Sequence, residues 1–327
     1  MRRLLKNSRV LITGGAGFIG SNLIESMLNA GNLVLCLDNF ATGKRENIND
    51  FIDNPNFRLL EGDIRNYTDC TEAVKGIDIV FHQAALGSVP RSIQDPVSSA
   101  DVNIGGFVKM LFASKEAGVK RFIYAASSST YGDHPDLPKV EENIGKPLSP
   151  YGITKYVNEL FADNFASTYG IDVIGLRYFN VFGKRQDPYG AYAAVIPLFV
   201  KKLMKHEAPV INGNGLNSRD FTYIDNVVQV NHLASLVTNK AALNQVYNVA
   251  HGERTNLNEL YDMIKSIIGK YDKEVLYIKP VHGPERAGDI PHSQASVAKA
   301  QKLLGYKPSH TVKEGLMEAI KWYRDNL

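Results

Sequence analysis

The stretch from residue 9 to residue 38, RVLITGGAGFIGSNLIESMLNAGNLVLCLD, decides the fold. An apolar run (9–13) ends at a glycine-rich turn, GGAGFIG (14–20), and a segment with apolar residues at helical spacing follows. A second apolar run (33–37) then ends at Asp38. Strand, glycine turn, helix, strand and acid in this order are typical of a βαβ unit that binds a dinucleotide.

Each part of this unit has a physical reason. Gly14 permits a tight turn, Gly17 lets the backbone approach a pyrophosphate, and Gly20 allows the helix to pack closely on the strand. The N–H groups and the positive dipole end of the helix attract phosphate. Asp38 would accept hydrogen bonds from the adenosine ribose and repel a 2′-phosphate, which favours NAD over NADP.

The composition indicates a soluble protein of one large or two modest domains. The 327 residues are 44% apolar and 22% charged, which is ordinary for a globular chain. The formal charge of +3 is compatible with an anionic small molecule, and the basic residues form no stripe for nucleic acid. Two cysteines, Cys36 and Cys70, give neither a disulfide framework nor metal-ligand spacing, so we expect a reducing cytoplasm. The sequence shows no membrane-length apolar stretch, no cleavable leader and no metal-binding pattern of histidines.

The alternation of strand and helix continues along the chain. Further apolar runs lie at 57–61, 77–81, 121–126 and 172–178, with helix-like stretches between them. This pattern predicts an α/β fold with a doubly wound, parallel Rossmann-type sheet that binds ligands at the carboxyl ends of its strands. Five residues fall at such ends: Asp63, Gln83, Ala85, Ser127 and Asn180.

Beyond Tyr178 the character of the sequence changes. A polar, turn-rich segment (183–191) and a glycine/asparagine loop (212–217) interrupt the alternation. We therefore expect a smaller α/β cap that binds the substrate and lies over the sheet. The expected division is an NAD-binding domain at 1–180, to which the chain returns at about 221–250, and a substrate domain at 181–220 and 251–327.

A serine run and a tyrosine–lysine pair carry the candidate chemistry. The apolar run before residue 127 ends in Ser127, Ser128 and Ser129. Tyr151 and Lys155 follow a Ser-Pro pair that has the pattern of a helix start, so they lie one helical turn apart. Hydroxyls at the exit of a strand could converge with this pair on one reacting atom.

The tyrosine–lysine spacing alone is weak evidence, because the chain contains it twice. Tyr261 and Lys265 repeat it in the predicted helix that follows Asn256. There the tyrosine shares a helix face with Leu257 and Ile264, so we expect a core aromatic residue beside a surface lysine.

Taken together, the motifs resemble the extended short-chain dehydrogenases/reductases, in their nucleotide-sugar epimerase branch. The phrasing is most similar to bacterial UDP-N-acetylglucosamine 4-epimerases in three segments, 87–93, 149–160 and 177–197. The pieces that carry the resemblance are GGAGFIG, Asp38-Asn39, Gly62-Asp63-Ile64, HQAA (82–85), the serines before Tyr131-Gly132, Tyr151-x-x-x-Lys155, RYFNVFG (177–183), RDFTYID (219–225) and RAGD (286–289).

The resemblance implies an isomerase with a tightly held NAD that is recycled within each turnover. In this family the cofactor oxidises C4 of the sugar to a ketone, and the hydride returns to the other face after the sugar has rotated. Tyr151 would be the general base, and Lys155 would lower its pKa together with the positive nicotinamide. Ser127, with Ser128 next, would share the proton, and which serine acts stays open.

The resemblance also assigns the binding residues. The cofactor would contact Gly14, Gly17, Phe18, Ile19, Gly20, Asp38, Asn39, Gly43, Asp63, Ile64, Gln83, Ala84, Ala85, Asn103, Tyr151, Lys155 and Tyr178. The UDP part would contact Asn180, Arg219, Arg286 and Asp289, with backbone contacts to the uracil from Ala194 and Val195. The sugar pocket would include Ser88, Arg91, Ser128 and Ser293, the last at a position where plain galactose epimerases usually carry a bulky tyrosine.

The motifs allow more than one function. We expect interconversion of UDP-N-acetylglucosamine and UDP-N-acetylgalactosamine, for surface polysaccharide precursors. A rival is the corresponding uronate, whose carboxylate Arg91 or Lys184 could bind, and UDP-glucose could be a second substrate. A 4,6-dehydratase is disfavoured, because that branch has an Asp-Glu pair where this chain has serines. A non-catalytic NAD-binding protein is disfavoured by the retained tyrosine and lysine. The family also implies a homodimer through helices around 103–116 and 151–168.

Overall fold

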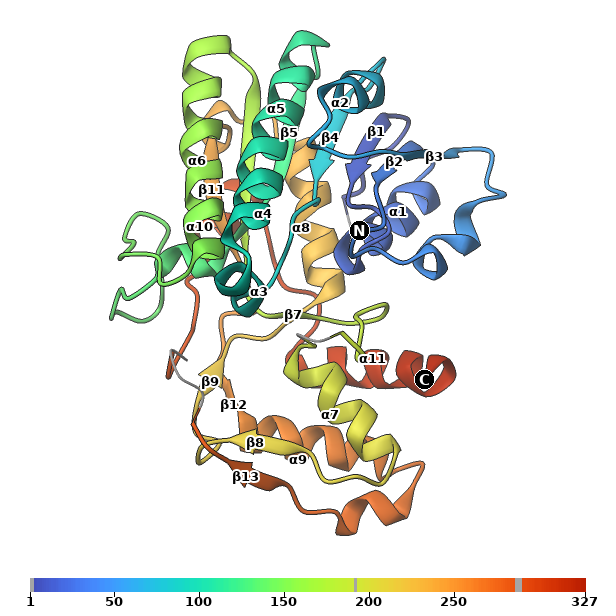
Figure 1. The fold of residues 1–327 in the computed structure, drawn as a ribbon, viewed down its shortest axis with the longest axis vertical. Coiled ribbons are helices and arrows are strands. Elements are labelled where there is room, and N and C mark those ends of the chain that lie inside the picture. Colours follow the sequence, from blue (N-terminus) through green and yellow to red (C-terminus); the bar gives the residue numbers. More distant parts are fainter. Residues whose placement is uncertain (1–2, 191–192, 286–289) are drawn as a thin grey trace.

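A parallel sheet of seven strands forms the centre of the computed structural model, which describes residues 3–190, 193–285 and 290–327 (Figure 1). In sheet order the strands are β3 (Phe57–Glu61), β2 (Leu33–Asp38), β1 (Arg9–Thr13), β4 (Ile79–His82), β5 (Arg121–Ser127), β6 (Asp172–Tyr178) and β11 (Gln245–Val249). The chain steps outward from β1 first in one direction and then in the other, so the predicted doubly wound sheet is confirmed.

The register of β1 brings the functional strand ends together. Thr13 at the end of β1 lies opposite Leu37 of β2 and His82 of β4. The strand β4 begins two residues later than its apolar run suggests. Asp78, just before it, instead donates its N–H to the carbonyl of Arg9 and accepts the Arg9 N–H on its carboxylate.

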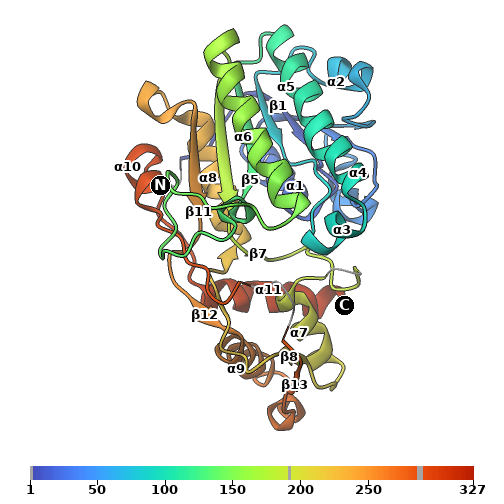
Figure 2. The same ribbon diagram turned by 60° about the vertical axis from the view of Figure 1, so that its left-hand side comes forward.

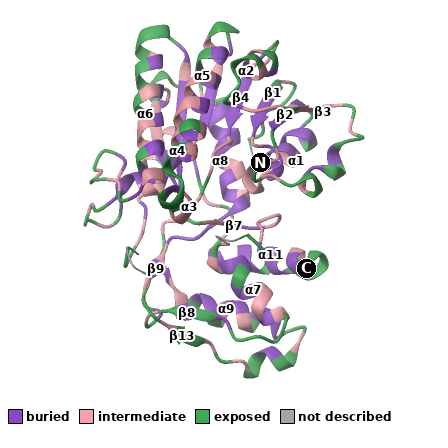
Figure 3. Cartoon of the chain, viewed as in Figure 1, coloured by how far each residue is buried: buried purple, intermediate pink, exposed green. Residues whose placement is uncertain are grey.

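Helices cover both faces of the sheet (Figures 1 and 2). One face carries α1 (Phe18–Asn29) and α8 (Ile224–Leu236), and the other carries α2 (Tyr67–Ala73), α5 (Phe107–Glu116) and α6 (Pro150–Tyr169). Successive side chains of β1 serve the two faces in turn: Val10 and Ile12 pack in one core, Leu11 in the other. Figure 3 shows the strands buried between the helices, whose outer sides are exposed.

Short helices connect these layers. The predicted helix around 103–116 begins as a π-helical turn, Asp101–Gly106, and becomes α-helical at Phe107. Such turns are frequent at functional sites. The other short elements are η1 (Arg45–Asn47), η2 (Asn49–Phe51), α3 (Val89–Gln94), α4 (Pro96–Ala100), η4 (Ser128–Tyr131), η5 (Lys240–Ala242) and η6 (Lys273–Tyr277).

A smaller group of elements lies beyond the carboxyl ends of the strands of the large sheet (Figure 1). It contains α7 (Val195–Met204), α9 (Leu257–Ile268), α11 (Val312–Asn326), and the pairs β8 (Val210–Asn212) with β13 (Val281–Gly283) and β9 (Ser218–Arg219) with β12 (Thr255–Asn256). The pair β7 (Val181–Phe182) and β10 (Thr222–Tyr223) lies where the chain passes between the two groups.

The chain crosses between the two groups more often than expected. The helix α10 (Ala298–Leu304) packs against β11 and α8 of the large sheet, although its residues fall within the predicted cap. The division into a cofactor domain and a substrate domain stays a prediction.

None of the described helices is both long and apolar enough to cross a membrane. The described residues also contain no group of three His, Cys, Asp or Glu side chains suited to a metal ion.

Candidate active site

The glycine turn between β1 and α1 adopts the geometry that its sequence predicts. Gly14 has a φ of +66°, and its carbonyl accepts the N–H of Gly17 at 3.1 Å. A Cβ on Gly20 would lie 2.2 Å from the same carbonyl oxygen, so only glycine fits there. Gly17 is the N-cap of α1. The positive end of α1 therefore faces the space in front of the turn, where a pyrophosphate would be attracted.

A cleft of about 710 Å³ opens in front of the glycine turn, at the carboxyl ends of the strands. With one exception among the described residues, every predicted cofactor residue lines it. The exception is Asn103 on the π-helical turn. Its side chain hydrogen-bonds the backbone of Leu86 (2.7 and 3.1 Å) and the hydroxyl of Thr154 on α6 (3.2 Å). Asn103 thus ties the cleft wall to α6, and its predicted contact with the cofactor stays a prediction.

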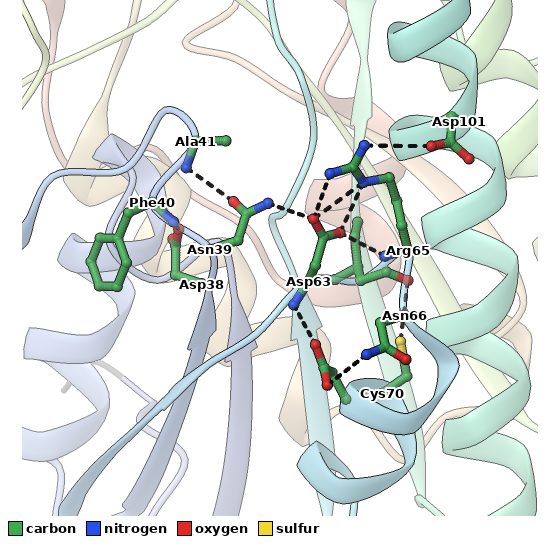
Figure 4. Close-up of polar contacts among 11 residues, drawn as sticks. Asp38, Asn39, Phe40, Ala41, Asp63, Arg65, Asn66, Cys70 and Asp101 are labelled. Atoms are coloured by element: carbon green, nitrogen blue, oxygen red, sulfur yellow. Dashed lines mark hydrogen bonds and ion pairs between the residues drawn. The ribbon is translucent and has the colours of Figure 1, made fainter.

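Three acidic and amide side chains gather at the end of β2 and β3 (Figure 4). The Asp38 carboxylate accepts the N–H groups of Ala16 (2.9 Å) and Phe40 (2.8 Å), and Asn39 donates to Asp63 at 2.8 Å. Burial raises the pKa of Asp38, while the two backbone N–H groups oppose that rise. Each carboxylate oxygen keeps a further lone pair, so Asp38 can still accept ribose hydroxyls. This end of the cleft fits the adenosine half of NAD.

Arg65 is a cleft residue that the sequence did not point to. Its guanidinium binds Asp63 at 2.7 Å and lies 3.6 Å from Asp101 (Figure 4). The hydrogen bonds from Arg65 hold the pKa of Asp63 at about 2. Asp63 is therefore ionised at physiological pH, and its orientation is fixed. Nothing in the local sequence indicates that this loop arginine would bind Asp63.

The start of α6 is fixed from two sides. Ser149 caps the helix and accepts the N–H of Gly152 at 3.1 Å. Ser92, a fully buried residue of α3, accepts the N–H of Tyr151 at 3.0 Å. The backbone of Tyr151 is thus anchored on α3, about sixty residues earlier in the chain. No motif in the sequence points to Ser92.

The predicted catalytic side chains meet in the cleft. Tyr151, Lys155 and Ser127 all line it, and Ser127 lies close enough to the tyrosine hydroxyl to affect its pKa. Lys155 donates to the carbonyl of Ala125 on β5 at 2.9 Å, and its Nζ lies 5.9 Å from the centre of the Tyr151 ring. Ser128 is not among the described lining residues. Of the two candidate serines, Ser127 is therefore the one beside the tyrosine.

The protein's own groups raise the pKa of the candidate base. Burial raises the pKa of Tyr151, and the hydrogen bond from Ser127 opposes the rise. Burial also lowers the pKa of Lys155 to about 8. In the chain alone desolvation is the larger effect, and the lowering of the tyrosine pKa by Lys155 together with the nicotinamide stays a prediction. The positive charge of an oxidised nicotinamide ring would be needed for that lowering.

The predicted sugar-nucleotide residues continue from the cleft toward the smaller group of elements. Asn180 lines the cleft and donates its side-chain N–H to the carbonyl of Asp220 at 3.2 Å. Next to it, Arg219 on β9 donates to the carbonyl of Ser218, which also accepts the N–H of Ser293 at 3.0 Å. Arg219 and Ser293 thus lie on neighbouring segments, although they are far apart in sequence.

The remaining predicted substrate residues have mixed positions. Ser88 lines the cleft with a φ of +95° and caps α3 by accepting the N–H of Arg91 at 3.3 Å. Ala194 and Val195 form the N-terminus of α7. Arg286 and Asp289 lie outside the described residues, so their predicted contacts with the diphosphate and the uridine ribose stay predictions.

A loop after β7 is held against the cofactor side of the cleft. Glu25 on α1 binds both Lys184 (2.6 Å) and Arg185 (2.7 Å). Asp187 binds Lys44 at 3.0 Å, and Gln186 between these pairs lines the cleft. Gln186 is a second lining residue that sequence reasoning missed, because its position depends on partners more than a hundred residues away.

Comparison with known proteins gives a consistent result. The sequence model of the NAD dependent epimerase/dehydratase family matches residues 10–250. A putative UDP-glucose 4-epimerase from Methanocaldococcus jannaschii is 36% identical over 97% of this chain and 99% of its own length.

Two solved structures share the whole fold. A UDP-N-acetylglucosamine 4-epimerase from Methanobrevibacter ruminantium, in complex with UDP-N-acetylmuramic acid, has a TM-score of 0.91 and 36% identity, with 99% of this chain and 100% of that chain covered. A tyrosine-to-phenylalanine variant of UDP-glucuronic acid 4-epimerase from Bacillus cereus, with a fluorinated UDP-sugar and NAD, has a TM-score of 0.87 and 30% identity, covering 98% and 100%. On the match over residues 10–250 and the identity along the whole chain, this protein belongs to the NAD-dependent epimerase/dehydratase family.

Proposed function

We propose that the chain is an NAD-dependent UDP-sugar 4-epimerase that interconverts UDP-N-acetylglucosamine and UDP-N-acetylgalactosamine. The observation that carries the proposal is the meeting of Tyr151, Ser127 and Lys155 in one cleft with the glycine turn. A hydroxyl pair beside a dinucleotide site is what a reversible oxidation of a sugar alcohol needs.

The chain's own groups supply the proton chemistry. The Tyr151 phenolate would take the proton from the sugar 4-hydroxyl and, as the hydroxyl, would later return it. The Ser127 hydroxyl would share this proton. NAD⁺, which the residues around the glycine turn would hold, would supply the hydride acceptor for this oxidation and the hydride donor for the return step. Lys155, held on the Ala125 carbonyl, would bind the nicotinamide ribose and keep a positive charge near the phenolate. A buried site excludes water, so these electrostatic effects are stronger than in solution.

The choice of sugar rests on two further observations. Ser293 is a small residue beside Arg219, which leaves room for an N-acetyl group on C2 of a sugar whose diphosphate Arg219 binds. The rival uronate would need a cation for its carboxylate, and Lys184 was one candidate. Lys184 instead pairs with Glu25 at 2.6 Å, which weakens the case for the uronate.

A direct assay tests the proposal. The purified protein is incubated separately with UDP-N-acetylglucosamine, UDP-glucose and UDP-N-acetylglucosaminuronate, without added NAD⁺, and the epimers are resolved by NMR. Conversion of UDP-N-acetylglucosamine with the highest kcat/KM supports the proposal. Preference for the uronate would replace the substrate, and no conversion of any of the three would overturn the epimerase assignment.

Enlarging residue 293 tests the sugar pocket. Ser293→Tyr is expected to lower kcat/KM for UDP-N-acetylglucosamine by about tenfold to a hundredfold, because the ring would fill the space of the N-acetyl group. The conversion of UDP-glucose, which lacks that group, serves as the internal control and should change much less. Equal losses for both sugars would contradict the proposed position of the N-acetyl group.

We also propose that the protein is a homodimer through α5 and α6. These two helices pack side by side and expose Phe112, Ile153 and Leu160, the last two on one face of α6 at a spacing of two helical turns. Exposed apolar side chains on two neighbouring helices suit a twofold contact with a second copy.

Leu160→Glu is expected to convert the dimer into a monomer, as measured by size-exclusion chromatography with light scattering. The reason is that a carboxylate at the centre of the face would be buried without a partner. Leu216→Glu is the matched control, because Leu216 is similarly exposed (57% against 53%) but lies in a loop between β8 and β9. A dimer that survives Leu160→Glu would exclude this face.

A further inference from the structure

Ser129 makes two contacts with the serine beside the candidate base. Ser127 ends β5 and caps η4, and its Oγ accepts the backbone N–H of Ser129 at 3.2 Å. The Ser129 hydroxyl donates to the same Oγ at 2.9 Å. Ser127 is 8% exposed, so few waters compete for these bonds. The mechanism proposed above gives Ser129 no role.

The two contacts determine what the Ser127 hydroxyl can do. A hydroxyl oxygen has two acceptor positions and one proton. Both acceptor positions of Ser127 are taken by the N–H and the O–H of Ser129. Its own proton must therefore point away from η4. In that direction lies the cleft, which Ser127 and Tyr151 both line.

We propose that Ser129 is a positioning residue that fixes Ser127 as a hydrogen-bond donor toward Tyr151 and the sugar 4-oxygen. The inference rests on the proposed epimerase function and deepens it. A donor held on the phenolate stabilises the charged form of the tyrosine, which is the form that takes the proton from the sugar. Without the Ser129 hydroxyl, the Ser127 proton can turn back toward η4 and leave the phenolate without this donor.

Other charged groups do not confound this effect, because the substitution leaves them in place. Arg91 lies on α3, which packs against the start of α6. The titratable groups that share the cleft with Tyr151 are Lys155 on α6, Tyr178 on β6, and Asp38, Asp63 and Arg65 at the adenosine end.

The first test is the pH profile of turnover. Ser129→Ala keeps the backbone N–H and so keeps the cap on η4. It is expected to lower kcat about three- to tenfold, with KM unchanged, as for the loss of one hydrogen bond. The rise of kcat with pH should move to higher pH by about half to one pH unit, because a phenolate with one donor fewer has a higher pKa. Ser129→Thr keeps a hydroxyl at this position, so its kcat and its pH profile should stay close to those of the wild type.

The matched control removes a hydroxyl from the same turn. Thr130 is buried in η4, and its Oγ1 has no hydrogen-bond partner among the described residues. Thr130→Val should leave the pH profile unchanged. The positioning role would be overturned if the Ser129→Ala profile stays at the wild-type pH, or if Thr130→Val shifts the profile equally. Ser129 would then only supply the backbone N–H that Ser127 caps.

A second readout does not need turnover. Ultraviolet difference absorbance of the tyrosinate, with Tyr151→Phe holoenzyme as the reference, reports the titration of Tyr151 alone. Ser129→Ala should move this titration to higher pH, and an unmoved titration would overturn the inference. If no UDP-sugar is converted, the proposed function fails while this titration still decides the role of Ser129.

Discussion

Tyr151→Phe is expected to reduce the rate of 4-epimerisation by about a thousandfold or more, while the protein keeps its bound NAD. The substitution removes the hydroxyl that lies beside Ser127 in the cleft and leaves the ring and the helix start unchanged. General acid–base groups typically contribute between a hundredfold and ten-thousandfold to a rate. Here the same group would act in both half-reactions, so the loss should lie toward the upper end.

Two measurements separate lost chemistry from a lost cofactor. NMR of the UDP-sugar mixture gives turnover, and the nucleotide released on denaturation gives NAD occupancy. Lys155 and the glycine turn are untouched by the substitution, so occupancy should stay at the wild-type level. Activity within tenfold of wild type would refute Tyr151 as the base.

The chain supplies its own control in the second tyrosine–lysine pair. Tyr261 is 3% exposed and donates its hydroxyl to the carbonyl of Ile278 at 2.6 Å, and Lys265 lies 4.9 Å from the ring centre. The predicted core position of this tyrosine is confirmed. Tyr261→Phe loses one buried hydrogen bond, so it should reduce stability slightly and leave turnover unchanged. The comparison shows that position in the fold, not spacing, distinguishes the two pairs.

The sheet could be predicted from local sequence because each strand corresponds to an apolar run of its own. The bounds of β1, β3 and β6 coincide with their apolar runs. β1 and β6 are buried on both faces, where continuous apolar residues are needed, whereas β3 is an edge strand with exposed residues. The helix that follows Asn256 was also expected, and α9 begins there with a capping box between Asn256 and Glu259. These features depend on residues within one turn or one strand of each other.

The parts of the site that escaped prediction all depend on contacts between distant segments. Ser92 holds Tyr151 across 59 positions, and Glu25 holds Lys184 across 159 positions. The effect of burial on the Tyr151 pKa also escaped prediction, because desolvation depends on how the whole cleft closes around the hydroxyl. No local pattern of residue types contains this information.

The largest expected effect on stability comes from a buried ion pair behind the active site. Glu159, one turn beyond Lys155 on α6, accepts two hydrogen bonds from the Arg177 guanidinium on β6 at 2.8 and 2.7 Å. The two side chains are only 7% and 4% exposed. Burial alone would lower the pKa of Arg177, but its bonds to Glu159 raise it, so the guanidinium stays charged.

Glu159→Gln is therefore expected to lower the free energy of unfolding by about 3–5 kcal/mol, because it leaves the Arg177 charge buried without a counter-charge. Urea denaturation followed by circular dichroism measures the change. Glu61→Gln is the matched control: Glu61 binds Arg45 at 2.6 Å, a similar distance, but both side chains are more than half exposed. Exposed pairs contribute little, so this variant should unfold close to wild type. The double variant Glu159→Leu/Arg177→Met removes both charges and should be less destabilised than Glu159→Gln, since no unpaired charge remains. If the double variant is the less stable of the two, the cost lies in packing and in the other Arg177 contacts rather than in the stranded charge.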